Sequence, residues 1–165
     1  MDVLIQYLSL CWLQNNPLKL PRSVSFLKQN LLFYFVVAFF MQTNMTDDPI
    51  DSFIEVTLKT LLTFVFIGVL LFLSRMLYAY VQVMTAIIFC ANVVGLFIVP
   101  VVVWLTVSED ILSYYLLAML LLWNYVLVTY IFKQVLAVNI PAGMVLSLFY
   151  FLITYFGAFA LGQLL

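Results

Sequence analysis

Five long apolar stretches fill most of this chain, and they constrain its fold more than any other feature of the sequence. Hydrophobic residues make up 67% of its 165 residues and charged residues only 8%, whereas roughly a quarter of the residues in soluble proteins are charged. A helix of about 20 apolar residues crosses a bilayer with all its backbone polar groups satisfied. The sequence therefore predicts a single all-α, polytopic membrane domain. Its five spans are expected at about 24–41, 56–73, 80–107, 111–132 and 142–161.

The charged residues between these stretches are sorted by sign. One set of segments carries the basic residues Lys19, Arg22, Lys28, Arg75 and Lys133. The alternate segments carry the acidic residues Asp47, Asp48, Asp51, Glu55, Glu109 and Asp110. The positive-inside rule then predicts a cytoplasmic N-terminus and an external C-terminus, which would be periplasmic in a bacterial inner membrane.

Lys59 is the single basic residue on the acidic side, and Glu55 lies four residues before it. Residues at this spacing share a helix face, so we expect the two to pair at the start of the second span. No charged side chain is then expected near the middle of a span, where ion pumps and proton-coupled transporters usually have one. Asp47, Asp48 and Asp51 could together suggest a cation site. A role for Asp51 as the N-cap of the next helix is favoured over that alternative.

Residues 2–14 predict a short amphipathic helix before the first span. Their apolar residues recur at helical spacing, and Asn15-Asn16-Pro17 ends the pattern. We expect this helix to lie in the cytoplasmic interface, with Trp12 at the depth of the lipid headgroups. A docking helix for a partner protein is the alternative.

The chain offers few groups for catalysis or metal binding. It has no histidine and no glycine-rich phosphate loop. Cys11 and Cys90 are expected at different depths, which indicates neither a disulfide nor a metal cluster. We therefore expect no enzymatic activity, no cofactor, no metal and no nucleic-acid partner. The expected partners are membrane lipids, contacted by Lys19, Arg22 and Lys28, and a membrane protein or a second copy of the chain.

Small and polar residues inside the spans are candidate contact positions. The third and fifth spans each contain two small residues four apart, which allow close helix approach within the bundle or to another subunit. The third and fourth spans each contain an asparagine, which favours an interhelical hydrogen bond over a ligand site. A proline in the third span predicts a kink. The candidate helix-packing or partner-contact residues are Ala91, Asn92, Gly95, Pro100, Asn124, Ala158 and Gly162.

Two local stretches resemble the Yip1 family of small membrane proteins. The first is Asn16-Pro17, followed by Pro21 and Phe26-Leu27. The second begins at Trp123 and continues through Tyr130-Ile131-Phe132-Lys133-Gln134-Val135 to Ile140-Pro141-Ala142. With five spans, the chain resembles a compact bacterial member. The resemblance implies the five-helix fold, but not the vesicle-traffic role of eukaryotic members, whose Asp-Leu-Tyr-Gly-Pro motif is absent here.

These observations favour a non-enzymatic scaffold or accessory subunit that presents helix faces to partners in the membrane. The alternative is a small permease or channel-like protein for an uncharged or lipid-like solute. If that alternative holds, one cavity should be lined by Thr85, Asn92, Pro100 and Asn124. An enzyme would have to work with Tyr, Ser, Asn or peripheral acids, a poor set for general acid–base chemistry.

Overall fold

The computed structural model describes residues 2–45, 48–108 and 110–164, so the predictions for Asp47 and Glu109 lie outside the described residues. Among the residues described, five helical segments are long and apolar enough to cross a membrane. They are α2 (Val24–Thr43), α3 (Pro49–Leu73), α4 (Tyr80–Ser108), α5 (Ile111–Leu136), and a last span made of α6 (Ile140–Phe151), η3 (Leu152–Phe156) and α7 (Gly157–Gly162). The short elements are α1 (Asp2–Leu10), η1 (Pro17–Lys19) and η2 (Leu77–Ala79). The predicted all-α membrane fold and its N-terminal helix are confirmed.

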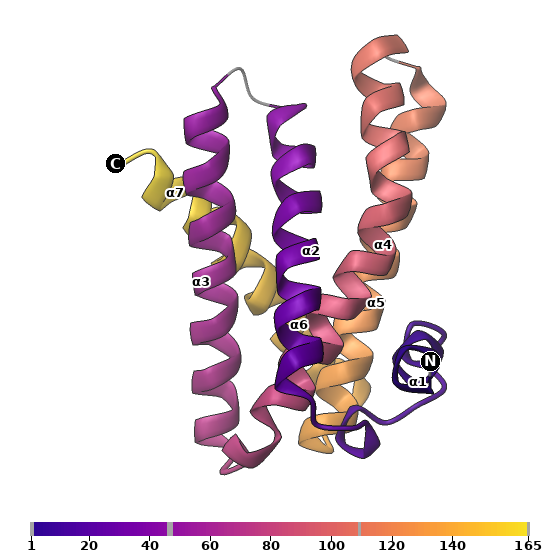
Figure 1. Ribbon diagram of the computed structural model, residues 1–165, viewed down its shortest axis with the longest axis vertical. Helices are drawn as coiled ribbons and strands as arrows, with labels where there is room; N and C mark the ends of the chain where they lie inside the picture. The colour runs from indigo at the N-terminus through magenta and orange to yellow at the C-terminus, as the bar shows by residue number, and fades with distance from the viewer. Residues whose placement is uncertain (1, 46–47, 109, 165) are drawn as a thin grey trace.

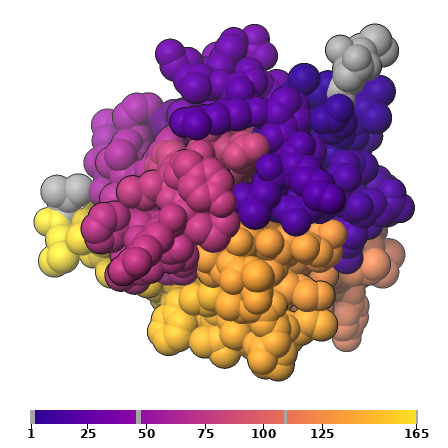
Figure 2. Space-filling model, turned by 90° about the horizontal axis from the view of Figure 1, so that it is seen from below, coloured from indigo at the N-terminus to yellow at the C-terminus, as the bar shows by residue number. Residues whose placement is uncertain are grey.

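The five spans run alternately up and down, as Figure 1 shows. Helices α2, α4 and α6 begin at the end where α3 and α5 finish. We call this the basic end, because it carries Lys19, Arg22, Lys28, Arg75 and Lys133. The opposite, acidic end carries Asp48, Asp51 and Asp110. Figure 2 looks onto the basic end, where the N-terminal segment and the α3–α4 and α5–α6 turns meet in a continuous surface.

Side-chain caps fix where the spans begin. Asp48 caps α3 by accepting a 2.8 Å hydrogen bond from the backbone N–H of Ile50, and Pro49 supplies a preset first helical residue. The helix therefore begins at Pro49 rather than near Val56, and the prediction of Asp51 as the cap is wrong. Asp51 lies instead in the first turn, where its charge still suits the helix dipole. The caps of α2, α5 and α6 are Ser23, Asp110 and Asn139.

The bundle is packed unevenly along its length. Helix α4 is central, and its residues 83–90, toward the basic end, are all buried. Apart from Ser113 in the first turn, the buried residues of α5 likewise fall between Leu127 and Val135, near the same end. Toward the acidic end, α4 and α5 lean away from α2 in Figure 1, and only Ile98 and Val102 of α4 remain buried. The basic half therefore holds the dry core, and the acidic half is the more open one.

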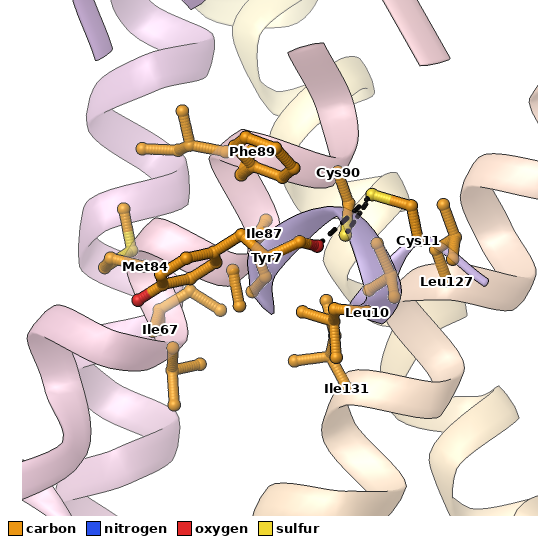
Figure 3. Close-up of a cluster of buried hydrophobic side chains, with 14 of the residues drawn as sticks. Tyr7, Leu10, Cys11, Ile67, Met84, Ile87, Phe89, Cys90, Leu127 and Ile131 are labelled. Atoms are coloured by element: carbon orange, nitrogen blue, oxygen red, sulfur yellow. Dashed lines mark hydrogen bonds between the residues drawn. The ribbon is translucent and has the colours of Figure 1, made fainter. Parts of the chain in front are cut away.

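Helix α1 packs into this core through one side. Tyr7, Leu10 and Cys11 are buried, and the Tyr7 hydroxyl donates a 3.1 Å hydrogen bond to the carbonyl of Pro21. Figure 3 shows Cys11 pointing toward Cys90, with their sulfur atoms 3.5 Å apart. Both are free thiols. The expectation that the two cysteines lie at different depths is wrong, because α1 docks against the middle of α4.

The last span changes geometry halfway along. Segment η3 is a π-helix, whose wider turn holds one more residue than an α-helical turn. Before it, α6 packs on α5, where Thr129 donates a 3.1 Å hydrogen bond to the hydroxyl of Ser147. After it, α7 packs on α3, where Gly162 faces Glu55. The π-helix thus lies where the span changes its partner.

Candidate functional site

A cavity opens between the spans in the less densely packed, acidic half. It has a volume of about 180 Å³ and is lined by α2, α3, α4, α5, η3 and α7. Its lining extends from Met45, which follows the end of α2, to Lys59 in α3. We call it the Lys59 cavity. At about 30 Å³ per water molecule, it has room for about six waters.

Lys59 contributes a charged side chain deep inside the bundle. It is the eleventh of the 25 residues of α3, about 15 Å along the helix axis from Pro49. The prediction that no charged side chain lies near the middle of a span is therefore wrong. No ion pair joins Lys59 to Glu55 or to any other carboxylate of the described residues. Its ammonium lies instead 3.6 Å from the centre of the Tyr155 ring.

Tyrosines form the surroundings of the ammonium. Tyr34, Tyr150 and Tyr155 are its electrostatic neighbours, and they come from α2, α6 and η3. A cation over a desolvated aromatic face gains about 2 kcal/mol or more, whereas a lysine at the centre of a bilayer costs at least about 2.5–3.5 kcal/mol. The ring offsets part of the cost of burying this charge, and hydrogen bonds with Tyr34 and Tyr155 offset a further part. Water or a ligand in the Lys59 cavity would solvate the remaining face of the ammonium.

A smaller inner pocket continues from the Lys59 cavity toward the core. Its volume is about 40 Å³, and Lys59, Tyr155 and Met41 line both spaces. Asn124 of α5 also lines the inner pocket, and its buried Oδ1 atom has no hydrogen-bond partner among the described residues. A buried carbonyl oxygen left without a donor costs roughly 1–3 kcal/mol. The inner pocket thus carries a second polar group whose bonding capacity the described protein leaves unused.

Glu55 adds a negative charge at the outer part of the cavity. The Gln42 side-chain amide donates a hydrogen bond to its carboxylate, which joins the end of α2 to α3. Glu55 and Lys59 lie one turn apart on the same face of α3, and both line the Lys59 cavity. The cavity therefore contains one positive and one negative side chain, with the positive one deeper.

An apolar groove adjoins the cavity on the lipid-facing side of the bundle. It has a volume of about 360 Å³ and lies between α5 and the last span. Tyr155 and Leu121 line both the groove and the Lys59 cavity. The remaining lining residues are Tyr125, Leu148, Phe151, Leu152 and Phe156. The ring of Tyr155 thus separates a space that contains the polar side chains of Gln42, Glu55 and Lys59 from an apolar one outside it.

The four residues expected to converge on a cavity do not do so. Only Asn124 lines the inner pocket. Asn92 faces α2, where its amide donates a 2.9 Å hydrogen bond to the carbonyl of Asn30. The Thr85 hydroxyl bonds within its own helix, at 2.6 Å from the carbonyl of Val81, and Pro100 is exposed. The site is built instead on lysine and tyrosine side chains.

The small-residue positions pack inside this chain. A Cβ added at Gly95 would lie 3.1 Å from the Val37 side chain of α2, and one at Gly162 would lie 3.3 Å from Glu55 of α3. Ala91 lines the inner pocket, and Ala158 is buried beside the Lys59 cavity. The close helix approach that these residues permit is therefore used within the bundle. The predicted lipid contacts Lys19, Arg22 and Lys28 are all exposed at the basic end.

Sequence reasoning missed the four residues that define the site, namely Tyr34, Lys59, Tyr150 and Tyr155. The Asp48-Pro49 pair could have located Lys59, because it predicts a helix that begins a full two turns before the apolar run. The tyrosines carry no comparable local signal. No family model, no curated protein and no solved structure matches this chain. The geometry of the Lys59 cavity is therefore the basis of the functional proposal.

Proposed function

We propose that this protein is a permease-like integral membrane protein that binds a small polar or lipid-like solute in the Lys59 cavity. The observation that carries the proposal is Lys59 itself, a cation near the middle of a span without a carboxylate partner among the described residues. Ionisable residues at such depths are costly, and they usually mark a solute or ion pathway. The unused oxygen of Asn124 lies in the adjoining inner pocket.

The positive-inside rule supports an orientation with the basic end in the cytoplasm. In that orientation the cavity would face the external side, the periplasm if the host membrane is a bacterial inner membrane. The packed core between Tyr7, Val83 and Leu127 would separate it from the cytoplasm. This arrangement suits a solute that enters the cavity from the external side and binds there before it crosses the membrane.

Cysteine accessibility tests the proposal directly. Lys59→Cys places a thiol at the floor of the cavity, and Leu61→Cys places one two residues away on the lipid-facing side of α3, where Leu61 is 55% exposed. A charged, membrane-impermeant thiosulfonate reagent should modify the first variant in sealed vesicles and leave the second unmodified. Because Cys11 and Cys90 are buried, the parent protein should react little with the reagent and give a low background.

The side from which the reagent acts also tests the orientation. Modification of Lys59→Cys only from the outside of right-side-out vesicles is expected. If Lys59→Cys reacts no faster than Leu61→Cys from either side, the cavity holds no water in the membrane and the proposal fails. Proteoliposome swelling in glycerol or glycine betaine, compared with protein-free liposomes, then asks whether bound solute crosses.

A scaffold or accessory-subunit role is the second proposal, and it draws on the resemblance to the Yip1 family. The residues that carry this resemblance shape chain turns: Asn16 accepts a 2.9 Å hydrogen bond from the backbone of Leu18, and Pro17 is buried. Pro141 lies in the first turn of α6. These roles concern the fold rather than chemistry. Co-purification from native membranes with a stoichiometric membrane protein would favour this proposal over the permease-like one.

A further inference from the structure

The two charges of the Lys59 cavity lie on one helix face, one turn apart. Glu55 and Lys59 are separated by four residues of α3, which is about 6 Å along the helix axis. Glu55 receives a neutral amide from Gln42, and Lys59 lies over the neutral ring of Tyr155. Each charge is therefore solvated by neutral groups, and no ion pair joins the two within the described part of the chain.

This arrangement selects against ligands of a single charge. An anion at Lys59 would meet the carboxylate of Glu55 one turn away, and a cation at Glu55 would meet the ammonium of Lys59. A ligand that carries both charges about one helical turn apart satisfies both side chains at once. The net charge of the pair is zero, so such a ligand adds no net charge to the interior of the bundle.

We propose that the Lys59 cavity binds a zwitterion, with its cationic group beside Glu55 and its anionic group beside Lys59. The inference rests on the proposed function, and it names the class of solute that the cavity accepts. Glu55 lies nearer the acidic end, so the anionic group enters first and lies deepest. Asn124 lies beyond Lys59 in the inner pocket.

The zwitterion can be a free solute or the headgroup of a lipid. The apolar groove between α5 and the last span meets the cavity at Tyr155 and Leu121. A zwitterionic lipid would place its phosphate at Lys59, its amine at Glu55 and one acyl chain in this groove. A free zwitterion would occupy the cavity of about 180 Å³ alone.

Four probes that share one alkyl chain distinguish binding through the charge of the headgroup from binding through the chain. They are dodecylphosphocholine (zwitterionic), dodecyl phosphate (anionic), dodecyltrimethylammonium (cationic) and dodecyl maltoside (uncharged), with the zwitterion glycerophosphocholine as the probe without a chain. Affinities are measured by native mass spectrometry of the protein in nanodiscs. We expect dodecylphosphocholine to bind at least about ten-fold more tightly than the other three. Equal binding of glycerophosphocholine would identify a soluble zwitterion, and loss of binding without the chain would identify a lipid.

Two single substitutions give opposite changes in preference. Lys59→Met leaves Glu55 alone and should shift the preference to dodecyltrimethylammonium, whereas Glu55→Gln leaves Lys59 alone and should shift it to dodecyl phosphate. Arg75→Met, at the exposed basic end, is the matched control and should change nothing. Circular dichroism and size-exclusion profiles confirm that each variant is folded. Glu55→Gln also keeps a side chain that can accept the Gln42 hydrogen bond.

The outcomes separate this inference from the proposed function. The wild type could instead prefer dodecyl phosphate or dodecyl maltoside, with a preference that is lost in Lys59→Met. That result would overturn the assignment of a zwitterion but would keep the cavity as a binding site. Equal affinities for all four alkyl probes, unchanged in both variants, would show chain binding alone and would also overturn it. Failure of the thiosulfonate reagent to reach Lys59→Cys would remove the proposed function and the inference together.

Discussion

The sulfur of Cys11 lies 3.5 Å from the sulfur of Cys90, so the N-terminal helix meets the middle of α4 at two thiols. A disulfide requires a sulfur separation of about 2.05 Å, which is an approach of about 1.5 Å from the reduced arrangement. Oxidation with diamide, which takes up both hydrogen atoms, should therefore join the two residues within one chain. A faster-migrating monomer on a non-reducing gel, absent in Cys11→Ser and in Cys90→Ser, is the expected result. Cross-linked dimers without this band would mean that α1 does not dock on its own chain.

Substitutions at two glycines should give opposite effects on folding. A Cβ at Gly95 would meet the Val37 side chain at 3.1 Å, whereas one at Gly68 would meet only Tyr80, at 3.7 Å. Gly95→Leu should destabilise the monomer, and overpacking of this kind typically costs about 1–3 kcal/mol. Gly68→Ala should be neutral or stabilising, because alanine gains up to about 1 kcal/mol over glycine in a helix.

Thermal unfolding in detergent, with size exclusion alongside, measures both glycine variants. Partial recovery of the stability of Gly95→Leu by Val37→Ala would locate the clash between α4 and α2. If Gly95→Leu keeps the unfolding temperature but loses an oligomer, Gly95 contacts another subunit instead.

Removal of the Lys59 charge should not destabilise the fold. The cost of the charge in the membrane is at least about 2.5–3.5 kcal/mol, and the contact with Tyr155 returns about 2 kcal/mol. Lys59→Met should therefore unfold at the same temperature as the wild type or at a higher one, with Lys28→Met as the unchanged reference. A midpoint several degrees lower would show that Lys59 serves the fold rather than a ligand.

The docking of α1 should weaken in strong alkali. Burial raises the pKa of Tyr7 to about 12, against a smaller opposite effect of hydrogen bonding with Thr85. The folded state thus favours the neutral hydroxyl, and this contribution to stability is complete below the usual pKa of 10.0. It is lost as the pH rises from about 10 to about 12. The unfolding temperature of the wild type should fall more steeply over this range than that of Tyr7→Phe. Parallel curves of unfolding temperature against pH for the two proteins would contradict the assignment of this effect to Tyr7.

The sequence predicted the spans well but placed Lys59 wrongly. Apolar runs long enough to cross a membrane are a local property, so α2, α4 and α5 were found within a few residues of their observed bounds. The polar first turns of α3 hid its true start, which depends on the cap at Asp48. That error of about two turns placed Lys59 at the membrane surface and suggested a pair with Glu55. The correct start places it close to the middle of the helix.

Contacts between distant segments could not be predicted in the same way. Cys11 and Cys90 meet only because α1 packs on α4, and the spacing of apolar residues in α1 does not distinguish a lipid surface from a protein groove as its partner. Tyr155 reaches Lys59 because the last span contains a π-helix. No composition signal in residues 152–156 separates that turn from an ordinary α-helical one.

The π-helix also makes the chain unusually tolerant of a change in its length at one point. A residue removed from an ordinary α-helical span turns everything after it by about 100° around the axis and shifts it by about 1.5 Å. The wider turn of residues 152–156 already holds one extra residue, so deletion of one residue there would restore an α-helix and leave Gly157, Ala158 and Gly162 close to their present positions against α3. The same deletion within α6 would instead rotate the wall that α7 contributes to the cavity away from α3.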